Sequence, residues 1–172
     1  ANLADMGYRA LVGAIMDRDP DQIETIITNT FDRAIRVLGR SNSWDGWRPD
    51  DTMYAHGTML YNATYGREMT LSATKALDLL KDTPWDLGKE VQDLIEDQLV
   101  DGFLRMSYGG WFDYNAAGRA VSRQSAGTLA TGYTGIVETI LELEPEDPET
   151  LEILLERLQS GPHPAHRVRG TK

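Results

Sequence analysis

The sequence of 172 residues contains no cysteine, which excludes disulfide bonds and cysteine-ligated metals. It contains no apolar run of transmembrane length, and its first residues lack the pattern of a signal peptide. Positive charge is scarce, since 17 Lys and Arg residues stand against 27 Asp and Glu residues for a net charge of −10. This balance argues against nucleic acid or an anionic membrane as the general partner. An anionic ligand still fits if the few cations are concentrated in one place.

Strand patterns are also lacking, because no stretch shows the apolar–polar alternation of a half-buried strand. Apolar residues, which make up 41% of the chain, recur instead at helical spacing. Three of the helical stretches begin with a capping residue followed by proline in the first turn, namely Asp19-Pro20, Thr83-Pro84 and Asp147-Pro148. The expected helices cover residues 3–16, 20–38, 58–65, 71–80, 84–105, 129–141 and 148–158.

We therefore predict an all-α protein of six or seven helices arranged as antiparallel pairs. Long irregular segments recur at one end of successive pairs, which favours part of an (α/α) toroid, an incomplete α/α barrel, over a compact bundle. The two segments are 44–66 and 109–123. The first holds two of the four tryptophans, three of the seven tyrosines and one of the three histidines. A long irregular segment of this composition is more typical of a functional site than of a linker.

Two candidate residues of the first segment, His56 and Tyr65, are nine positions apart and would face opposite sides of one straight helix. They share a site only if His56 lies in the loop before the helix and Tyr65 near the helix end. Gly57 and Gly66 would permit the two bends, with Gly66 ending the helix. The alternative is that each side chain is satisfied locally, and the spacing alone favours this alternative.

The second segment contains Arg119 and Arg123, which face one way if the segment is helical. Their guanidinium groups would hold carboxylate or sulfate groups and stabilise a nearby tyrosinate. Ion pairing with acidic side chains is the alternative. Asn115, in the same segment, is a candidate carboxylate partner or a turn residue.

Trp44, Trp47 and Trp111 are candidates for stacking on a sugar ring, or they close the end of the helical array. The candidates for the carboxyl pair of a glycoside hydrolase are Asp45, Asp50, Asp51 and Asp113, although Asp50-Asp51 after Pro49 also suits a cap of the following segment. His163 and His166 have no third ligand nearby, so we predict no metal.

The two segments together, DDTMYAHGTMLYNATYG and DYNAAGRAVSR, resemble polysaccharide lyase family 8, the family of hyaluronate, chondroitin AC and xanthan lyases. The resemblance rests on His56, on Tyr65-Gly66, and on Gly118-Arg119-Ala120-Val121-Ser122-Arg123 after Tyr114-Asn115. It extends from about residue 3 to about residue 158. His56 follows Ala55, where the family usually has Gln or a similar polar residue.

The resemblance implies an incomplete toroid that cleaves a uronic-acid polysaccharide by β-elimination without a metal or other cofactor. Tyr65 would act as the base and the acid, His56 would lie beside the substrate carboxylate, and Arg119 with Arg123 would bind anionic groups. The family's Asn-Trp-Trp motif and its β-sandwich domains are not found in this sequence. Residues 1–160 are therefore expected to be part of the catalytic domain, and residues 161–172 the start of a linker. The expected partners are the anionic polysaccharide and the remaining segments of the parent lyase, in a secreted or periplasmic protein.

Three other functions stay open at this point. A non-catalytic glycan-binding helical module would bind without cleaving bonds. A glycoside hydrolase using the aspartates would release saturated products. A helical scaffold domain would do neither.

Overall fold

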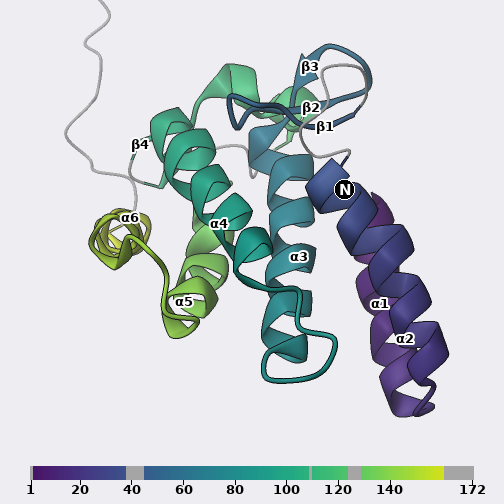
Figure 1. The fold of residues 1–172 in the computed structure, drawn as a ribbon. Coiled ribbons are helices and arrows are strands. Elements are labelled where there is room, and N and C mark those ends of the chain that lie inside the picture. The colour runs from purple at the N-terminus through teal and green to yellow at the C-terminus, as the bar shows by residue number, and fades with distance from the viewer. Residues whose placement is uncertain (1, 38–44, 109, 124–128, 161–172) are drawn as a thin grey trace, which may run out of the picture.

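The computed structural model describes residues 2–37, 45–108, 110–123 and 129–160. Most of this described chain is helical, and several of its helices stand side by side (Figure 1). The bounds are α1 Asn2–Met16, α2 Pro20–Ile26, α3 Arg67–Leu80, α4 Lys89–Asp97, α5 Thr134–Glu142 and α6 Pro148–Gln159. α1 packs against α2 and α3, α3 contacts α4 and α5, and α5 packs against α6. Links at the lower end of Figure 1 join α1 to α2 and α3 to α4, so each of these pairs is antiparallel.

Wider or tighter helical turns extend several of these helices. They are η1 Ile27–Val37 after α2, η3 Asn62–Gly66 before α3, η4 Gln98–Phe103 and η5 Leu104–Met106 after α4, and η9 Ala130–Tyr133 before α5. The helix predicted over residues 20–38 is thus present as α2 and η1, except that residue 38 lies outside the described residues. No helix of the described chain is both long and apolar enough to span a membrane.

Local capping explains two of the helix starts. The carboxylate of Asp19 accepts a hydrogen bond from the backbone N–H of Gln22 at 3.0 Å, and Pro20 occupies the first helical position of α2. The carboxylate of Asp147 accepts from the backbone N–H and the hydroxyl of Thr150 at 3.1 and 2.6 Å at the start of α6. Both predicted starts are confirmed.

The predicted helix start at Pro84 is wrong, because α4 begins at Lys89. The intervening residues form a turn in which the carboxylate of Asp86 accepts a hydrogen bond from the backbone N–H of Gly88 at 2.7 Å. Gly88 adopts a φ of +79°, which a helix does not permit. A Thr-Pro pair therefore marks a turn here, and the helix follows it.

Short strands occupy the two irregular segments. β1 (Gly46–Trp47), β2 (Met53–Ala55) and β3 (Met59–Leu60) form an antiparallel sheet in this order, and β4 (Ser107–Tyr108) pairs with β5 (Trp111–Phe112). Strands of two or three residues are too short to show alternation in the sequence, so these small sheets were not predictable from it.

The helix predicted over residues 58–65 is wrong in its first half. Met59 and Leu60 pair with Ala55 and Tyr54 in β3, and helical geometry begins only at η3. Gly66 does not end a helix, since its φ of −59° and ψ of −52° are helical and η3 runs on into α3. A Cβ at this position would lie 3.2 Å from the Met53 side chain, so the missing side chain serves close packing rather than a bend.

The core contains buried side chains from every helix from α1 to α6 and extends up to the short strands. At that end, the rings of Phe103 and Tyr133 stack with their centroids 3.8 Å apart. The hydroxyl of buried Tyr133 donates to the carbonyl oxygen of Asn62 at 2.6 Å. Burial raises the pKa of Tyr133, so this hydroxyl stays protonated. The bond ties η9 to η3 beneath the two irregular segments.

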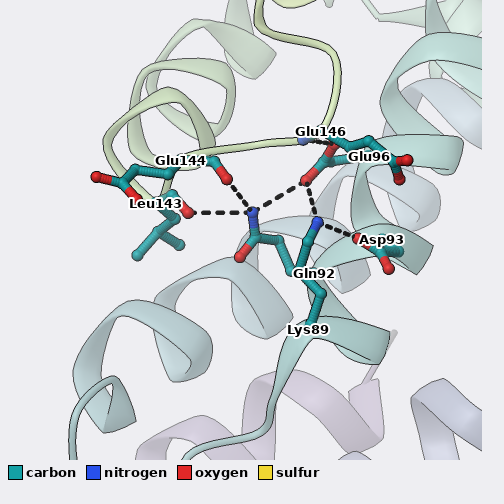
Figure 2. A network of polar contacts seen from close by, with 7 residues as sticks. All are labelled: Lys89, Gln92, Asp93, Glu96, Leu143, Glu144 and Glu146. Carbon is teal, nitrogen blue, oxygen red and sulfur yellow. Dashed lines mark hydrogen bonds and ion pairs between the residues drawn. The ribbon is translucent and has the colours of Figure 1, made fainter.

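A polar network around buried Gln92 and Glu96 joins α4 to the α5–α6 link (Figure 2). The amide nitrogen of Gln92 donates to the carbonyl of Leu143 at 3.1 Å and to the carboxylate of Glu96 at 3.0 Å. Glu96 also accepts from the backbone N–H of Glu146 at 2.9 Å. Lys89 lies 3.7 Å from the same carboxylate, so this buried charge is compensated.

Candidate active site

The second irregular segment folds back onto the first at one end of the helices. It contains two helical turns, η6 (Tyr114–Ala116) and η7 (Gly118–Ser122), and η7 packs against η3. The residues that carried the sequence argument therefore meet in space although they come from distant parts of the chain.

The hydroxyl of Tyr65 is contacted by side chains from both irregular segments. The Nε2 atom of His56 lies 3.3 Å from the hydroxyl oxygen of Tyr65, and the Nη2 atom of Arg119 donates to the same oxygen at 2.8 Å. The guanidinium carbon of Arg119 lies 5.9 Å from the centre of the Tyr65 ring. One phenol is thus held between an imidazole and a guanidinium.

The separation of nine residues is bridged by the β2–β3 turn. His56 lies in that turn with a φ of +54°, and Tyr65 lies in η3 before α3. The prediction that His56 precedes the helix is confirmed, whereas Tyr65 lies near the beginning of a long helix and not at the end of a short one. The local alternative that the spacing favoured is wrong, because the turn reverses the chain and brings the imidazole back to the phenol.

Asp45 anchors the turn that carries His56. Its carboxylate accepts from the backbone N–H groups of His56 and Gly57, both at 3.1 Å. Partial burial acts to raise the pKa of Asp45, but these two hydrogen bonds and the nearby His56 side chain outweigh it and lower the pKa below 3.8. Asp45 is therefore an ionised anchor rather than a general acid.

The other aspartates also serve the backbone. The carboxylate of Asp113 accepts from the backbone N–H and the side-chain amide of Asn115 at 2.7 and 3.1 Å. Asp51 adopts a φ of +60°, and its carbonyl oxygen accepts from the side-chain amide of Asn62 at 3.1 Å. The carboxylate of Asp113, like that of Asp45, is thus engaged in holding a turn.

Tyr61 packs against both His56 and Tyr65. The sequence analysis did not identify it as a residue of the site. Its buried ring lies 5.7 Å from His56 and 5.1 Å from Tyr65, measured between ring centroids. Its hydroxyl oxygen accepts from the backbone N–H of Arg119 at 3.3 Å. The signal available in the sequence was the spacing of four residues between Tyr61 and Tyr65, which places both on one helical face.

A pocket of about 310 Å³ opens beside Tyr65. Its lining residues are Tyr61, Thr64, Tyr65, Arg67, Glu68, Arg119, Ala120, Arg123 and Leu129. In a chain with a net charge of −10, three arginines and one glutamate face this hollow. Within the described residues, neither Arg119 nor Arg123 forms an ion pair, so the alternative of neutralisation by acidic side chains finds no support there.

Of the three tryptophans predicted to stack on a sugar ring, only Trp111 is exposed within the described residues. Trp47 is 3% exposed and packs in the core, so its ring cannot stack on a ligand and the alternative of closing the helical array holds for it. Trp111 is 51% exposed and lies opposite Tyr108 across the β4–β5 hairpin. Trp44 lies outside the described residues. Asn115 is exposed but turned toward Asp113.

In the part of the chain that the structure describes, no group of three or more His, Cys, Asp or Glu residues is placed to hold a metal ion. His163 and His166 lie outside that part. The pocket beside Tyr65 offers guanidinium and hydroxyl groups, which suit an anion, and the His56 imidazole contacts the Tyr65 hydroxyl at its edge.

Comparison with known families identifies the family of the chain. The N-terminal α-helical domain of polysaccharide lyase family 8 matches residues 1–158. The chain belongs to polysaccharide lyase family 8.

Individual relatives place the chain within longer family members. It is 24% identical over 144 residues to the polysaccharide lyase 8 family protein HylA of Enterococcus faecalis, covering 83% of this chain and 10% of the relative. It is 22% identical over 145 residues to hyaluronate lyase of Staphylococcus aureus, covering 83% of this chain and 18% of the relative. The chain therefore spans less than a fifth of the length of these relatives.

Among solved structures, a chondroitinase AC lyase studied with bound oligosaccharides superposes with a TM-score of 0.82 at 18% identity. The match covers 95% of this chain and 24% of that enzyme. At this identity the likeness concerns the fold, and it confirms the prediction of part of an (α/α) toroid.

Proposed function

We propose that this family 8 chain carries the acid–base part of a lyase site that cleaves a uronic-acid polysaccharide by β-elimination. The observation that carries the proposal is the Tyr65 hydroxyl, held between His56 and Arg119 at the edge of a cationic pocket. The activities of relatives, namely a hyaluronate lyase, a chondroitinase AC lyase and a xanthan lyase, support a polymer of the hyaluronan, chondroitin or xanthan class.

In the proposed reaction, Tyr65 takes up one proton from the substrate and later gives one back. The proton on C5 of the uronic acid lies alpha to the carboxylate and is removed by the Tyr65 phenolate. The C4–O4 bond breaks, its electron pair leaves with O4, and a C4=C5 double bond forms. Tyr65 then returns the proton to O4, so the tyrosine is restored and no water is consumed.

The neighbours of Tyr65 fit the charges that develop in this reaction. Arg119 donates a charge-assisted hydrogen bond that stabilises the phenolate form of Tyr65. His56, on the other side of the phenol, lies beside the substrate carboxylate and helps to neutralise it, which stabilises the enolate-like transition state. Arg123 holds anionic groups of the polymer on the same wall. Trp111 and Asn115 contact sugar rings at the periphery.

The proposal includes secretion or periplasmic residence, because a polysaccharide of this kind is met outside the cytoplasm. It also includes cooperation with the remaining segments of a parent lyase, since the relatives are several times longer than this chain.

The test is an ultraviolet assay for the unsaturated uronate product. Hyaluronan, chondroitin and xanthan are supplied to this chain alone and to a chain extended at both ends to the length of its relatives. We expect Tyr65→Phe to lower turnover at least about 100-fold, since general acid–base groups contribute about 10²–10⁴-fold. Tyr8→Phe, on α1, is the matched control and should retain wild-type turnover.

Near-normal turnover in Tyr65→Phe would refute the assignment. New reducing ends without the unsaturated product would instead indicate hydrolysis. Binding of the polymer without any cleavage, in both chains, would indicate a glycan-binding module.

A further inference from the structure

Arg67 is a third arginine in the pocket, and the elimination mechanism does not use it. It opens α3, two positions after Tyr65. Residues two apart on a helix do not face each other, so Arg67 and Tyr65 line different parts of the same hollow. A group bound by Arg67 is therefore not the one whose C5 proton Tyr65 removes.

The guanidinium of Arg67 is held in place by packing. Gly132 of η9 lies so close that a Cβ there would fall 2.4 Å from the Nη1 atom of Arg67. The Arg67 side chain is 31% exposed. It therefore packs against Gly132 on one side and remains accessible in the pocket that it lines. A preorganised guanidinium loses little conformational freedom when it binds an anion.

Most of the hydrogen-bonding capacity of Arg67 is unused in the described part of the chain. Within the described residues its one partner is the carboxylate of Glu68, which accepts from Nη2. The Nε atom of Arg67 and the hydroxyl of Thr64 on the same wall are buried without a partner. Buried polar groups are satisfied in most proteins, so a site with several open donors indicates a missing acceptor.

Glu68 occupies part of the place that such an acceptor would take. The Glu68 side chain is 42% exposed and lines the pocket. Its carboxylate pairs with the Arg67 guanidinium, so it takes the position in which a ligand anion would bind Arg67. Three arginines against this one glutamate leave the pocket cationic even with the pair formed.

We propose that Arg67 binds a second oxyanion of the polymer, either the carboxylate of another uronate of the chain or a sulfate on a sugar next to the uronate being cleaved, and that Glu68 competes with it. This rests on the proposed function for the identity of the polymer. The expected consequence is a pair of opposite effects: removing the Arg67 charge weakens binding, and removing the Glu68 charge strengthens it.

The experiment measures the affinity of this chain for hexasaccharides by calorimetry, so it does not depend on turnover. The probes are hyaluronan, unsulfated chondroitin and chondroitin 4-sulfate hexasaccharides. We expect Arg67→Gln to weaken binding about tenfold, as expected for loss of one charged hydrogen-bonding group. We expect Glu68→Gln to tighten binding several-fold. Arg9→Gln removes an exposed, ion-paired arginine from α1 and should leave the affinity unchanged.

The probes distinguish the two sources of the oxyanion. An equal effect of Arg67→Gln on all three hexasaccharides assigns a carboxylate, and a larger effect on chondroitin 4-sulfate assigns a sulfate. Equal weakening by Arg67→Gln and Glu68→Gln would overturn the proposal, because a merely structural ion pair behaves in that way. Unchanged affinity in Arg67→Gln, or no binding of any hexasaccharide by the unaltered chain, would overturn it as well.

Failure of the lyase assignment gives a different result. Tyr65→Phe with undiminished turnover would refute the role of Tyr65 while leaving the opposite effects of the Arg67 and Glu68 substitutions intact. Because Glu68→Gln is expected to gain affinity, a folding defect cannot imitate the predicted outcome.

Discussion

Replacing Gly118 with alanine tests how the second irregular segment holds Arg119 against Tyr65. Gly118 begins η7 with a φ of +54°, and its Cα faces the ring of Tyr61. A Cβ at this position would fall 2.2 Å from Cε1 and 2.4 Å from Cδ1 of Tyr61. Tyr61 accepts the backbone N–H of Arg119 at 3.3 Å, so moving its ring moves the residue that contacts Tyr65.

The expected magnitude has two parts. A residue with a side chain loses about 1–2 kcal/mol in the left-handed backbone conformation. Displacement of a buried ring by overpacking costs about 1–3 kcal/mol more. The free energy of unfolding should therefore fall by about 2–5 kcal/mol. Since a misplacement of about 1 Å can reduce a reaction about 100-fold, turnover by the lyase should fall by a similar factor even where Gly118→Ala remains folded.

Urea unfolding and the ultraviolet assay measure the two effects separately. Gly13→Ala is the matched control, because Gly13 lies inside α1 and a Cβ there would meet nothing within 4 Å. This control should be as stable as the original chain or up to about 1 kcal/mol more stable. Unchanged stability and turnover in Gly118→Ala would show that the contact between η7 and Tyr61 does not position Arg119.

Three further substitutions probe the fold and its response to pH. Tyr133→Phe removes the hydroxyl that donates to the Asn62 carbonyl at 2.6 Å, and it should lower the free energy of unfolding by about 1–3 kcal/mol in a urea titration. Glu96→Gln removes the buried carboxylate of the network in Figure 2, and it should destabilise the chain by about 1–2 kcal/mol while leaving lyase turnover unchanged, because no residue of the network lines the pocket beside Tyr65. Partial burial of Asp45 is outweighed by hydrogen bonds from two backbone amides of the β2–β3 turn, which hold its pKa below 3.8. A lowered pKa in the folded state gives stability that is present above pH 3.8 and lost as the pH falls through the folded-state pKa, so Asp45→Asn should flatten this acid limb of a stability–pH curve.

Several local features could be predicted because they depend on neighbouring residues. Asp19 and Asp147 were expected to cap helices, and both do so with side-chain hydrogen bonds to the following turn. The same reasoning failed at Pro84, where Asp86 and Gly88 form a turn and delay the helix. Capping signals therefore located helix starts only where no competing turn was present.

The small strands could not be predicted. Because they were not expected, the helix predicted over residues 58–65 was wrong in its first half. β3 takes residues 59 and 60 out of the expected helix, and its pairing with β2 creates the turn that presents His56. A strand of two residues is defined by its partner rather than by its own sequence, so only the folded chain shows it.

The sequence by itself determined the helical architecture, the family, and the kinds of side chain available for chemistry. Helical periodicity and the spacing within each motif are encoded over a few residues, so they survive without knowledge of the packing. Tertiary structure alone decided which of these side chains meet. It buried Trp47, added Tyr61 and Arg67 to the site, and brought Arg119 to Tyr65 across 54 residues of chain. Contacts over such distances depend on how turns and helices pack together, and no periodic pattern in a single sequence specifies them.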